Sequence, residues 1–217
     1  MMADLLIENT IAFVKQQLEG AEAGHDWFHI ERVFKTTQNI NEAEKGDATV
    51  VELAALLHDI ADPKFHDGDE ELGPKIAGQF LEQQAVNQII IDHVLNIIRH
   101  MSFKQSFDAQ TFDSLELRIV RDADRLDAIG AIGIARAFTY GGFKNRVLYD
   151  PAIPPADFKD KEAYKNSNGH TINHFYEKLL LLKDLMHTQK GKELAAKRHE
   201  FMEGFLEQFY AEWRGVV

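Results

Sequence analysis

Apolar residues return every three or four positions along most of the chain, which is the period of an amphipathic helix. The run 50–57 is apolar at nearly every position and would also fit a buried strand, but its Ala, Leu and Glu favour a helix. Alternating Val-Ile-Thr segments between hairpin turns are missing from the sequence. We therefore predict an all-α fold with helices at about 4–18, 26–44, 48–57, 72–81, 85–100, 115–136, 171–187 and 190–213.

The helical pattern stops between Gly141 and Gly169. This stretch holds three of the five prolines of the chain, together with Gly, Asn and Asp. A connection of this length inside a compact domain is usually functional or mobile. No repeat, low-complexity tract or linker divides the rest. We predict one domain over residues 1–217, with a core at about 20–130, one long irregular excursion at 141–169 and C-terminal helices at 170–214.

The composition removes several classes of site. The chain of 217 residues has no cysteine, which excludes a disulfide scaffold, a Cys-ligated zinc or iron–sulfur site and thiol catalysis. His, Asp and Glu remain as the strong metal ligands. Lys and Arg number 24 against 35 Asp and Glu, a net charge of −11. Such a surface repels a phosphate backbone, so we expect no nucleic acid polymer as a partner. A small anionic substrate would need a local cation.

The start of the chain has neither the charged region nor the apolar run of a signal peptide. No stretch approaches 18 uninterrupted apolar residues, so we expect no membrane span. These features predict a cytoplasmic protein. The apolar periodicity of the two C-terminal helices would allow a homodimer.

Histidine and aspartate gather at three places in the sequence. His29 lies near the start of a predicted helix, the pair His58-Asp59 ends an apolar helix, and Asp124 lies in an Asp-rich helix. A carboxylate at the C-terminal end of an apolar helix is unfavourable unless it is paired or binds a cation. A His-Asp pair alone is most often a polar helix end, but the three places together favour a metal site.

The same residues resemble the H…HD…D signature of the HD-domain metal-dependent phosphohydrolases. Longer stretches match this family in order: His-Asp-x-x-His-x-x-Arg-Val at 25–33, Leu-Leu-His-Asp-Ile-Ala-Asp at 56–62, Asp-Ala-Asp-Arg-Leu-Asp-Ala-Ile-Gly at 122–130, and His-Phe-Tyr-Glu-Lys-Leu-Leu at 174–180. Together they are similar to a group of small single-domain bacterial HD hydrolases across nearly the whole chain.

The resemblance implies an HD-domain helical bundle in which His29, His58, Asp59 and Asp124 bind one divalent metal ion. Two imidazoles and two carboxylates suit Mn (manganese), Mg, Co, Ni, Fe or Zn, which the pattern does not distinguish. Four protein ligands leave positions on an octahedral ion for water and a substrate phosphate oxygen. The metal would lower the pKa of the water and polarise the P–O bond.

Two residues on the loop after His58-Asp59 are candidates for catalysis. Asp62 stands where related HD hydrolases often carry an acidic residue that handles a proton at the attacking water; the alternative is a turn-forming role before Pro63. Lys64 could hold a phosphate as a mobile point charge, or be an ordinary solvated lysine.

Three further residues are candidates for contact with the substrate. His25 is one turn before His29 and is a ligand, a partner that orients a ligand, a substrate contact or a structural residue. Asp127 shares a helix face with Asp124 and either touches substrate or orients a ligand. His100 lies near the substrate at best. His93 and His100 are two turns, about 10 Å, apart on one helix, too far to hold one ion. We therefore predict a mononuclear site.

These observations predict a metal-dependent phosphohydrolase acting on a nucleotide or another small phosphate ester. The more specific prediction is an enzyme that hydrolyses nucleoside triphosphates to monophosphate and pyrophosphate. The sequence has no P-loop and no dinucleotide fingerprint, so a nucleotide would be held through the metal. The alternatives are a phosphatase or phosphodiesterase of the same fold and a di-iron HD oxygenase with a second ion. A non-catalytic interaction or sensor domain would be expected to have a degraded ligand set, and the intact set in this sequence argues for catalysis.

Overall fold

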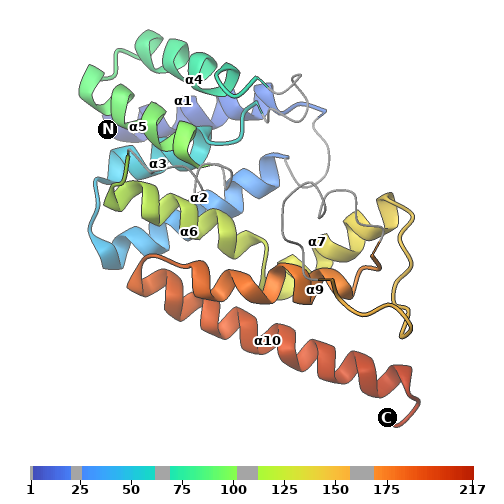
Figure 1. Ribbon diagram of the computed structural model, residues 1–217. Helices are drawn as coiled ribbons and strands as arrows, with labels where there is room; N and C mark the ends of the chain where they lie inside the picture. Colours follow the sequence, from blue (N-terminus) through green and yellow to red (C-terminus); the bar gives the residue numbers. More distant parts are fainter. Residues whose placement is uncertain (1, 21–25, 62–68, 102–111, 157–168) are drawn as a thin grey trace. The chain divides into compact units, whose positions relative to one another are not determined.

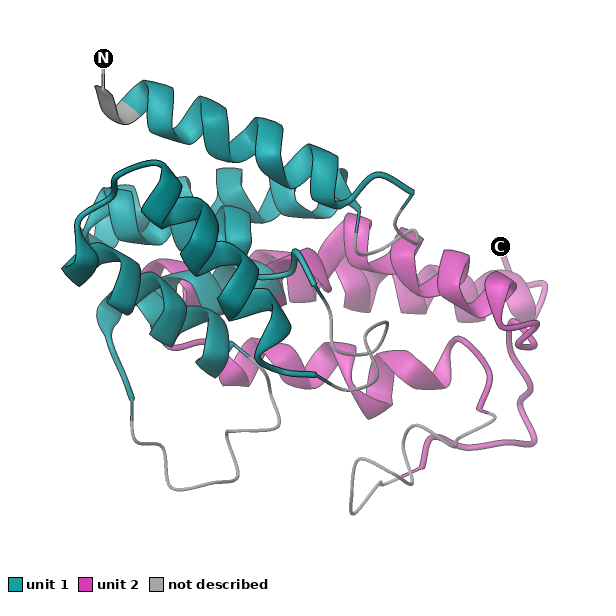
Figure 2. Cartoon of the chain, turned by 90° about the horizontal axis from the view of Figure 1, so that it is seen from above, with its two compact units in different colours: residues 1–124 teal, residues 125–217 magenta. Residues whose placement is uncertain are grey.

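The computed structural model describes residues 2–20, 26–61, 69–101, 112–156 and 169–217 (Figure 1). Every regular element in these ranges is a helix, which confirms the predicted all-α class. No helix in the described part of the chain combines the length and apolar character that a membrane crossing requires. The chain forms two compact units, residues 1–124 and 125–217 (Figure 2). A single domain over the whole chain stays a prediction.

The first unit is organised around one largely apolar helix, α3. Its elements are α1 (Met2–Gln17), α2 (Trp27–Glu44), α3 (Ala48–Leu57), α4 (Leu72–Gln83), α5 (Gln88–His100) and α6 (Leu115–Asp127), the last three residues of which belong to the second unit. Helix α3 packs against α1, α2 and α5. Seven of its ten side chains are buried. A helix with this many apolar side chains is stable only when a core buries them.

Aspartate side chains define where α2 and α3 begin. Oδ1 of Asp26 accepts a hydrogen bond from the backbone N–H of His29 at 3.0 Å. Oδ1 of Asp47 accepts one from Val50 at 3.1 Å. Both are N-caps, which satisfy amide groups that have no partner inside the helix. The caps confirm the predicted helix starts and place His29 in the first turn of α2.

The single helix predicted over 115–136 is wrong, because the chain breaks between α6 and α7 (Gly130–Phe143). Ile129 is extended, and Gly130 has a φ of 76°. A Cβ at Gly130 would also lie 3.0 Å from the side chain of Arg198. A lone glycine is tolerated within a helix, so the apolar pattern alone did not indicate this break.

The helix predicted over 171–187 is also interrupted. It forms α9 (Asn173–Glu177) and, after Lys178, the 3₁₀ helix η3 (Leu179–Leu185). Three residues per turn place Leu179 and Leu182 on one buried face, 3% and 7% exposed. The long helix α10 (Gln189–Trp213) packs against α7 and η3.

The segment predicted to be irregular over 141–169 begins three residues later, since α7 continues to Phe143. Residues 144–156 contain turns and bends, and 157–168 lie outside the described residues. The ring of Tyr149 fixes this segment in the second unit by edge-to-face contacts with rings of α10, at centroid distances of 5.8, 5.4 and 5.0 Å to Phe209, Tyr210 and Trp213.

Candidate metal centre

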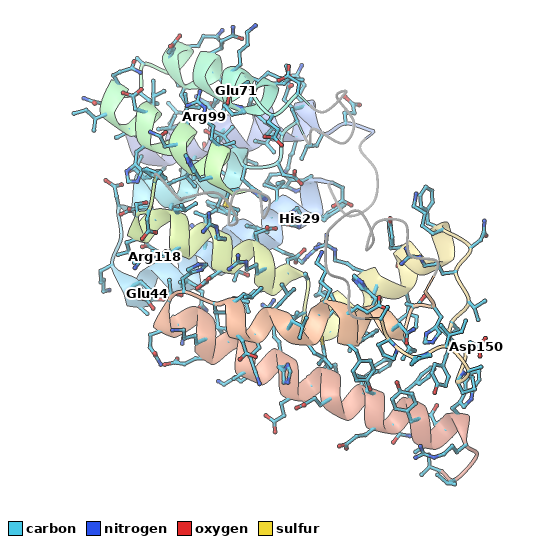
Figure 3. The ribbon with its side chains drawn as sticks, in the orientation of Figure 1. His29, Glu44, Glu71, Arg99, Arg118 and Asp150 are labelled. Carbon is cyan, nitrogen blue, oxygen red and sulfur yellow. The ribbon has the colours of Figure 1, made fainter. Side chains whose placement is uncertain are left out.

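Four side chains of the first unit meet at one place. Ligand atoms of His29, His58 and Asp59 all lie within 4.8 Å of one another. Oδ1 of Asp124 lies 3.5 Å from Nε2 of His29 and 3.8 Å from Nε2 of His58. His29 comes from the start of α2 (Figure 3), His58 and Asp59 directly follow α3, and Asp124 is in α6. The structure thus brings together the four residues that the sequence singled out.

The end of α3 sets the orientation of the His58 ring. Its Nδ1 lies 2.9 Å from the backbone oxygen of Ala55, one turn earlier. A carbonyl oxygen can only accept, so Nδ1 carries the proton and Nε2 presents its lone pair. This Nε2 is buried and has no hydrogen-bond partner among the described residues. A buried nitrogen with a free lone pair is costly, and a metal ion at this position would satisfy it.

Burial and charge within the group favour a cation. The side chains of His29 and His58 are 4% and 5% exposed, whereas that of Asp124 is 38% exposed. The imidazoles are therefore buried, and one carboxylate lies at an edge that solvent reaches. Two nitrogen and two carboxylate donors match the preferences of divalent ions of intermediate hardness. The residues present fit such an ion.

Asp127 lies one turn after Asp124 on α6 and forms an ion pair with an arginine. Its side chain is 4% exposed and pairs with the guanidinium of Arg136 on α7. The same guanidinium lies 3.4 Å from the backbone oxygen of Asp127, and Arg198 of α10 donates to the backbone oxygen of Leu126. Two arginines therefore bind the C-terminal end of α6, where the helix dipole favours positive charge. A substrate contact by Asp127 stays a prediction.

His100 and His93 both lie on α5, and each contacts different neighbours. Nδ1 of His100 lies 2.8 Å from the backbone oxygen of Asn96, and the His100 ring is 5.2 Å from that of Phe112. Nε2 of His93 lies 3.1 Å from Oγ of Ser114 and 3.5 Å from Oε2 of Glu116. Among the described residues, neither histidine belongs to the group of ligand atoms around His58.

The pKa of Glu116 reflects its contacts. Burial raises it, but hydrogen bonds from the backbone amides of Asp47 and Glu116 itself, with the nearby His93, hold it below its usual value. Glu116 is therefore an ionised side chain that joins the start of α3 to α5 and α6.

Three predicted residues, His25, Asp62 and Lys64, lie outside the described residues. Their predicted roles stay predictions.

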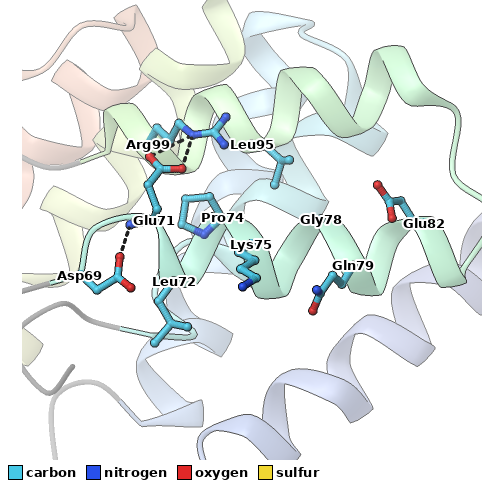
Figure 4. A pocket seen from close by; sticks show the side chains of 10 residues that line it. All are labelled: Asp69, Glu71, Leu72, Pro74, Lys75, Gly78, Gln79, Glu82, Leu95 and Arg99. Atoms are coloured by element: carbon cyan, nitrogen blue, oxygen red, sulfur yellow. Dashed lines mark hydrogen bonds and ion pairs between the residues drawn. The ribbon is translucent and has the colours of Figure 1, made fainter. Parts of the chain in front are cut away.

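A surface groove of about 600 Å³ lies along α4 and α5 (Figure 4). Glu71 and Arg99 pair across one end, with Nε and Oε2 3.1 Å apart. None of the residues that bring ligand atoms together lines the groove, which therefore does not belong to the candidate metal centre. Its lining residues are Asp69, Glu71, Leu72, Pro74, Lys75, Gly78, Gln79, Glu82, Leu95 and Arg99.

The residues that support the centre were not all apparent in the sequence. The Ala55 carbonyl is three residues before His58 at a helix end, a spacing that could have suggested the contact. Arg198 binds the end of α6 from 72 residues away along the chain, and no local pattern signals such a contact.

Comparison with known proteins agrees with this geometry. The HD domain model matches residues 27–129, which include all four converging residues. YpgQ of Bacillus subtilis is 39% identical over 210 residues, covering 96% of this chain and 94% of that protein. An HD-superfamily hydrolase from Bacillus thuringiensis has a TM-score of 0.80 and 46% identity, with 98% of each chain covered. The structure of YpgQ in complex with ADP has a TM-score of 0.76 and 35% identity over 98% of this chain and 97% of that one. This chain therefore belongs to the HD domain family and has the fold of its hydrolases.

Proposed function

We propose that this protein is a metal-dependent phosphohydrolase in which His29, His58, Asp59 and Asp124 hold one divalent cation. The observation that carries the proposal is the state of His58: its Nε2 is buried, has no hydrogen-bond partner among the described residues and lies 3.8 Å from Oδ1 of Asp124. A cation between the imidazoles and the carboxylates satisfies all four groups together.

The side chains around the ion would divide the remaining work. When bound, the cation supplies an activated water and withdraws charge from a phosphoryl oxygen. The Ala55 carbonyl holds the His58 ring in the tautomer that can bind a cation. We assign to Asp62 the removal of a proton from the attacking water, and to Lys64 the binding of a phosphate oxygen.

Substrate contacts are proposed for His25, His100 and Asp127. The carboxylate of Asp127 is paired with Arg136, so its contribution would come through that pair. Nδ1 of His100 is hydrogen-bonded to the backbone carbonyl of Asn96. Its other ring nitrogen, Nε2, is therefore the atom that would contact a substrate.

A nucleotide is the substrate class that we favour. YpgQ, a relative that matches nearly the whole chain, has been crystallised with ADP. A chain of net charge −11 also needs a local cation to attract a polyphosphate. In the reaction that we propose, water adds to the α-phosphorus of a nucleoside triphosphate and the bond to the β-phosphate is broken. The products are a nucleoside monophosphate and pyrophosphate.

The test is turnover of nucleoside tri-, di- and monophosphates with Mn²⁺, Mg²⁺, Co²⁺ or Ni²⁺, with pyrophosphate and orthophosphate measured separately. We expect pyrophosphate release that is lost in Asp59→Ala. The matched control is Asp92→Ala, which removes a carboxylate that bonds Gln88 on the surface of α5, and which should keep its activity.

Each other result would change the assignment. Orthophosphate release would make the enzyme a phosphatase, and cleavage of phosphodiesters a phosphodiesterase. Equal turnover by Asp59→Ala and wild type would contradict the proposed site. If no metal supported hydrolysis, two bound irons per chain would favour the di-iron oxygenase instead.

A further inference from the structure

Helix α10 carries an exposed phenylalanine at its midpoint. Its buried residues are Gly191, Ala195, Met202 and Leu206, and the helix packs against α7 and η3. Phe201 lies outside this buried face and is 57% exposed. Twelve residues of α10 precede it and twelve follow. In Figure 1, α10 forms the lower edge of the second unit, with α9 on its other side. A single exposed apolar residue is common on protein surfaces, so the charges beside it decide what it means.

The charges of α10 divide at Phe201. The half before it carries four basic and two acidic residues, and the half after it carries three acidic residues and no basic one. The basic residues are Lys190, Lys192, Lys197 and Arg198, and the acidic ones are Glu193 and Glu200 before Phe201 and Glu203, Glu207 and Glu212 after it. Helix α10 therefore has a positive N-terminal half and a negative C-terminal half.

This order of charges is opposite to the one that stabilises a helix by itself. The helix dipole favours acidic residues near the N-terminus and basic residues near the C-terminus. The first turn of α10 has no acidic residue, and its last turn has no basic residue. Within the part of the chain that the structure describes, neither Lys197 nor Glu207 takes part in an ion pair. Charges placed in this way are better satisfied by a second helix than by α10 alone.

We propose that α10 packs antiparallel against α10 of a second copy of this chain, across a two-fold axis at Phe201. The positive half of each helix then lies beside the negative half of the other, and the two helix dipoles are also antiparallel. A two-fold interface requires one surface to complement itself, and the division of charge at the midpoint of α10 meets this requirement. The two Phe201 rings meet at the axis and cover each other.

The register of the two helices follows from the position of the axis. A residue before Phe201 is level with the residue that lies the same number of positions after Phe201 in the other copy. Lys190 of one copy is then level with Glu212 of the other. Lys197 is offset from Glu207 of the other copy by two residues, or about 3 Å along the axis. Within one copy, Lys197 and Glu207 are about 15 Å apart along α10, so they meet only between copies.

Sedimentation velocity of the full-length protein over a range of concentrations tests the proposal. We expect a species with twice the 24.7 kDa mass of one chain. Phe201→Ser should weaken the dimer at least about 10-fold, because the substitution removes two apolar rings from each dimer. The matched control is Phe143→Ser, which removes a ring that is 63% exposed on α7 and should leave the dimer unchanged. A protein that stays monomeric, or equal weakening by the two substitutions, would overturn the proposal.

Reversal of charge tests the antiparallel register. Lys197→Glu and Glu207→Lys should each weaken the dimer by about 5- to 10-fold, since each places like charges opposite one another twice in the dimer. The variant that carries both changes should dimerise as the wild type does, because the pair is restored with its signs exchanged. Thermal melts check the fold of each variant, and the charge variants decide the outcome if Phe201→Ser is unfolded. A double variant that dimerises no better than the single ones would contradict the proposed contact between copies.

Discussion

The imidazole of His58 shows how one helix end can prepare a metal ligand. The Ala55 carbonyl lies in the last turn of α3, where helix carbonyls have no amide partner within the helix. It accepts a hydrogen bond from the Nδ1–H group of His58, and this fixes both the tautomer and the direction of the ring. The other nitrogen faces Oδ1 of Asp124 at 3.8 Å. The same turn of backbone therefore ends the helix and orients the ligand.

Replacing His58 by glutamine should weaken binding of Mn²⁺ at least about 100-fold, since even the partners that orient metal ligands are worth 10- to 100-fold. The matched control is His93→Gln, on α5. His93 contacts Ser114 and Glu116 and lies outside the group of converging ligand atoms. Isothermal titration of the two variants with Mn²⁺ checks this expectation. A loss of affinity in His93→Gln as large as that in His58→Gln would contradict it.

Single residues were predictable where a local pattern identifies them. His29, His58, Asp59 and Asp124 were found because their order along the chain follows a family signature, and the structure brings them together. The engagement of Asp127 with an arginine was not predicted. Its partner lies on the next helix, beyond a break that the apolar period did not show.

Helix starts were easier to predict than helix ends. Asp26 and Asp47 mark the starts of α2 and α3 by side-chain caps that the sequence displays directly. The breaks at Gly130 and Lys178 were not predicted from the apolar pattern. Gly130 has a φ of 76°, and a Cβ there would lie 3.0 Å from Arg198 of α10, a residue too far along the chain to enter a window of local sequence.

Substitution of two glycines should test the break between α6 and α7. Gly130→Ala should lower the free energy of unfolding by about 1–2 kcal/mol, because alanine is disfavoured at a φ of 76° and its Cβ would meet Arg198 at 3.0 Å. Gly204→Ala is the opposite control: it lies within α10 with nothing within 4 Å of the added Cβ. It should raise the free energy of unfolding by about 1 kcal/mol.

Urea unfolding followed by circular dichroism measures both changes. A Gly130→Ala protein as stable as the wild type would mean that the left-handed turn is not required there.

At the scale of the whole molecule, stability depends on the balance of its charges. The net charge of −11 at pH 7 gives a repulsion that weakens as the pH falls toward the pI of about 5.3. Buried groups that resist protonation act in the opposite direction. His174 is such a group, since its pKa is lowered to about 4 by burial and by the charges of Lys178 and Arg146. The effect of His174 on the free energy of unfolding can be separated from that of the other charges, because it is confined to the pH range between its unfolded and folded pKa values.

Between pH 6.5 and about 4, the unfolded chain binds a proton at His174 that the folded chain does not bind. Lowering the pH through this window therefore favours unfolding, and the contribution is absent above pH 7. From pH 7 to pH 5 the wild type should lose about 2 kcal/mol relative to a His174→Gln variant. The difference in unfolding free energy between the two proteins, measured in urea at pH 7, 6 and 5, isolates this one group from the titrating carboxylates that both share. A difference that stayed constant across this range would show that His174 is protonated as readily in the folded protein as in the unfolded chain.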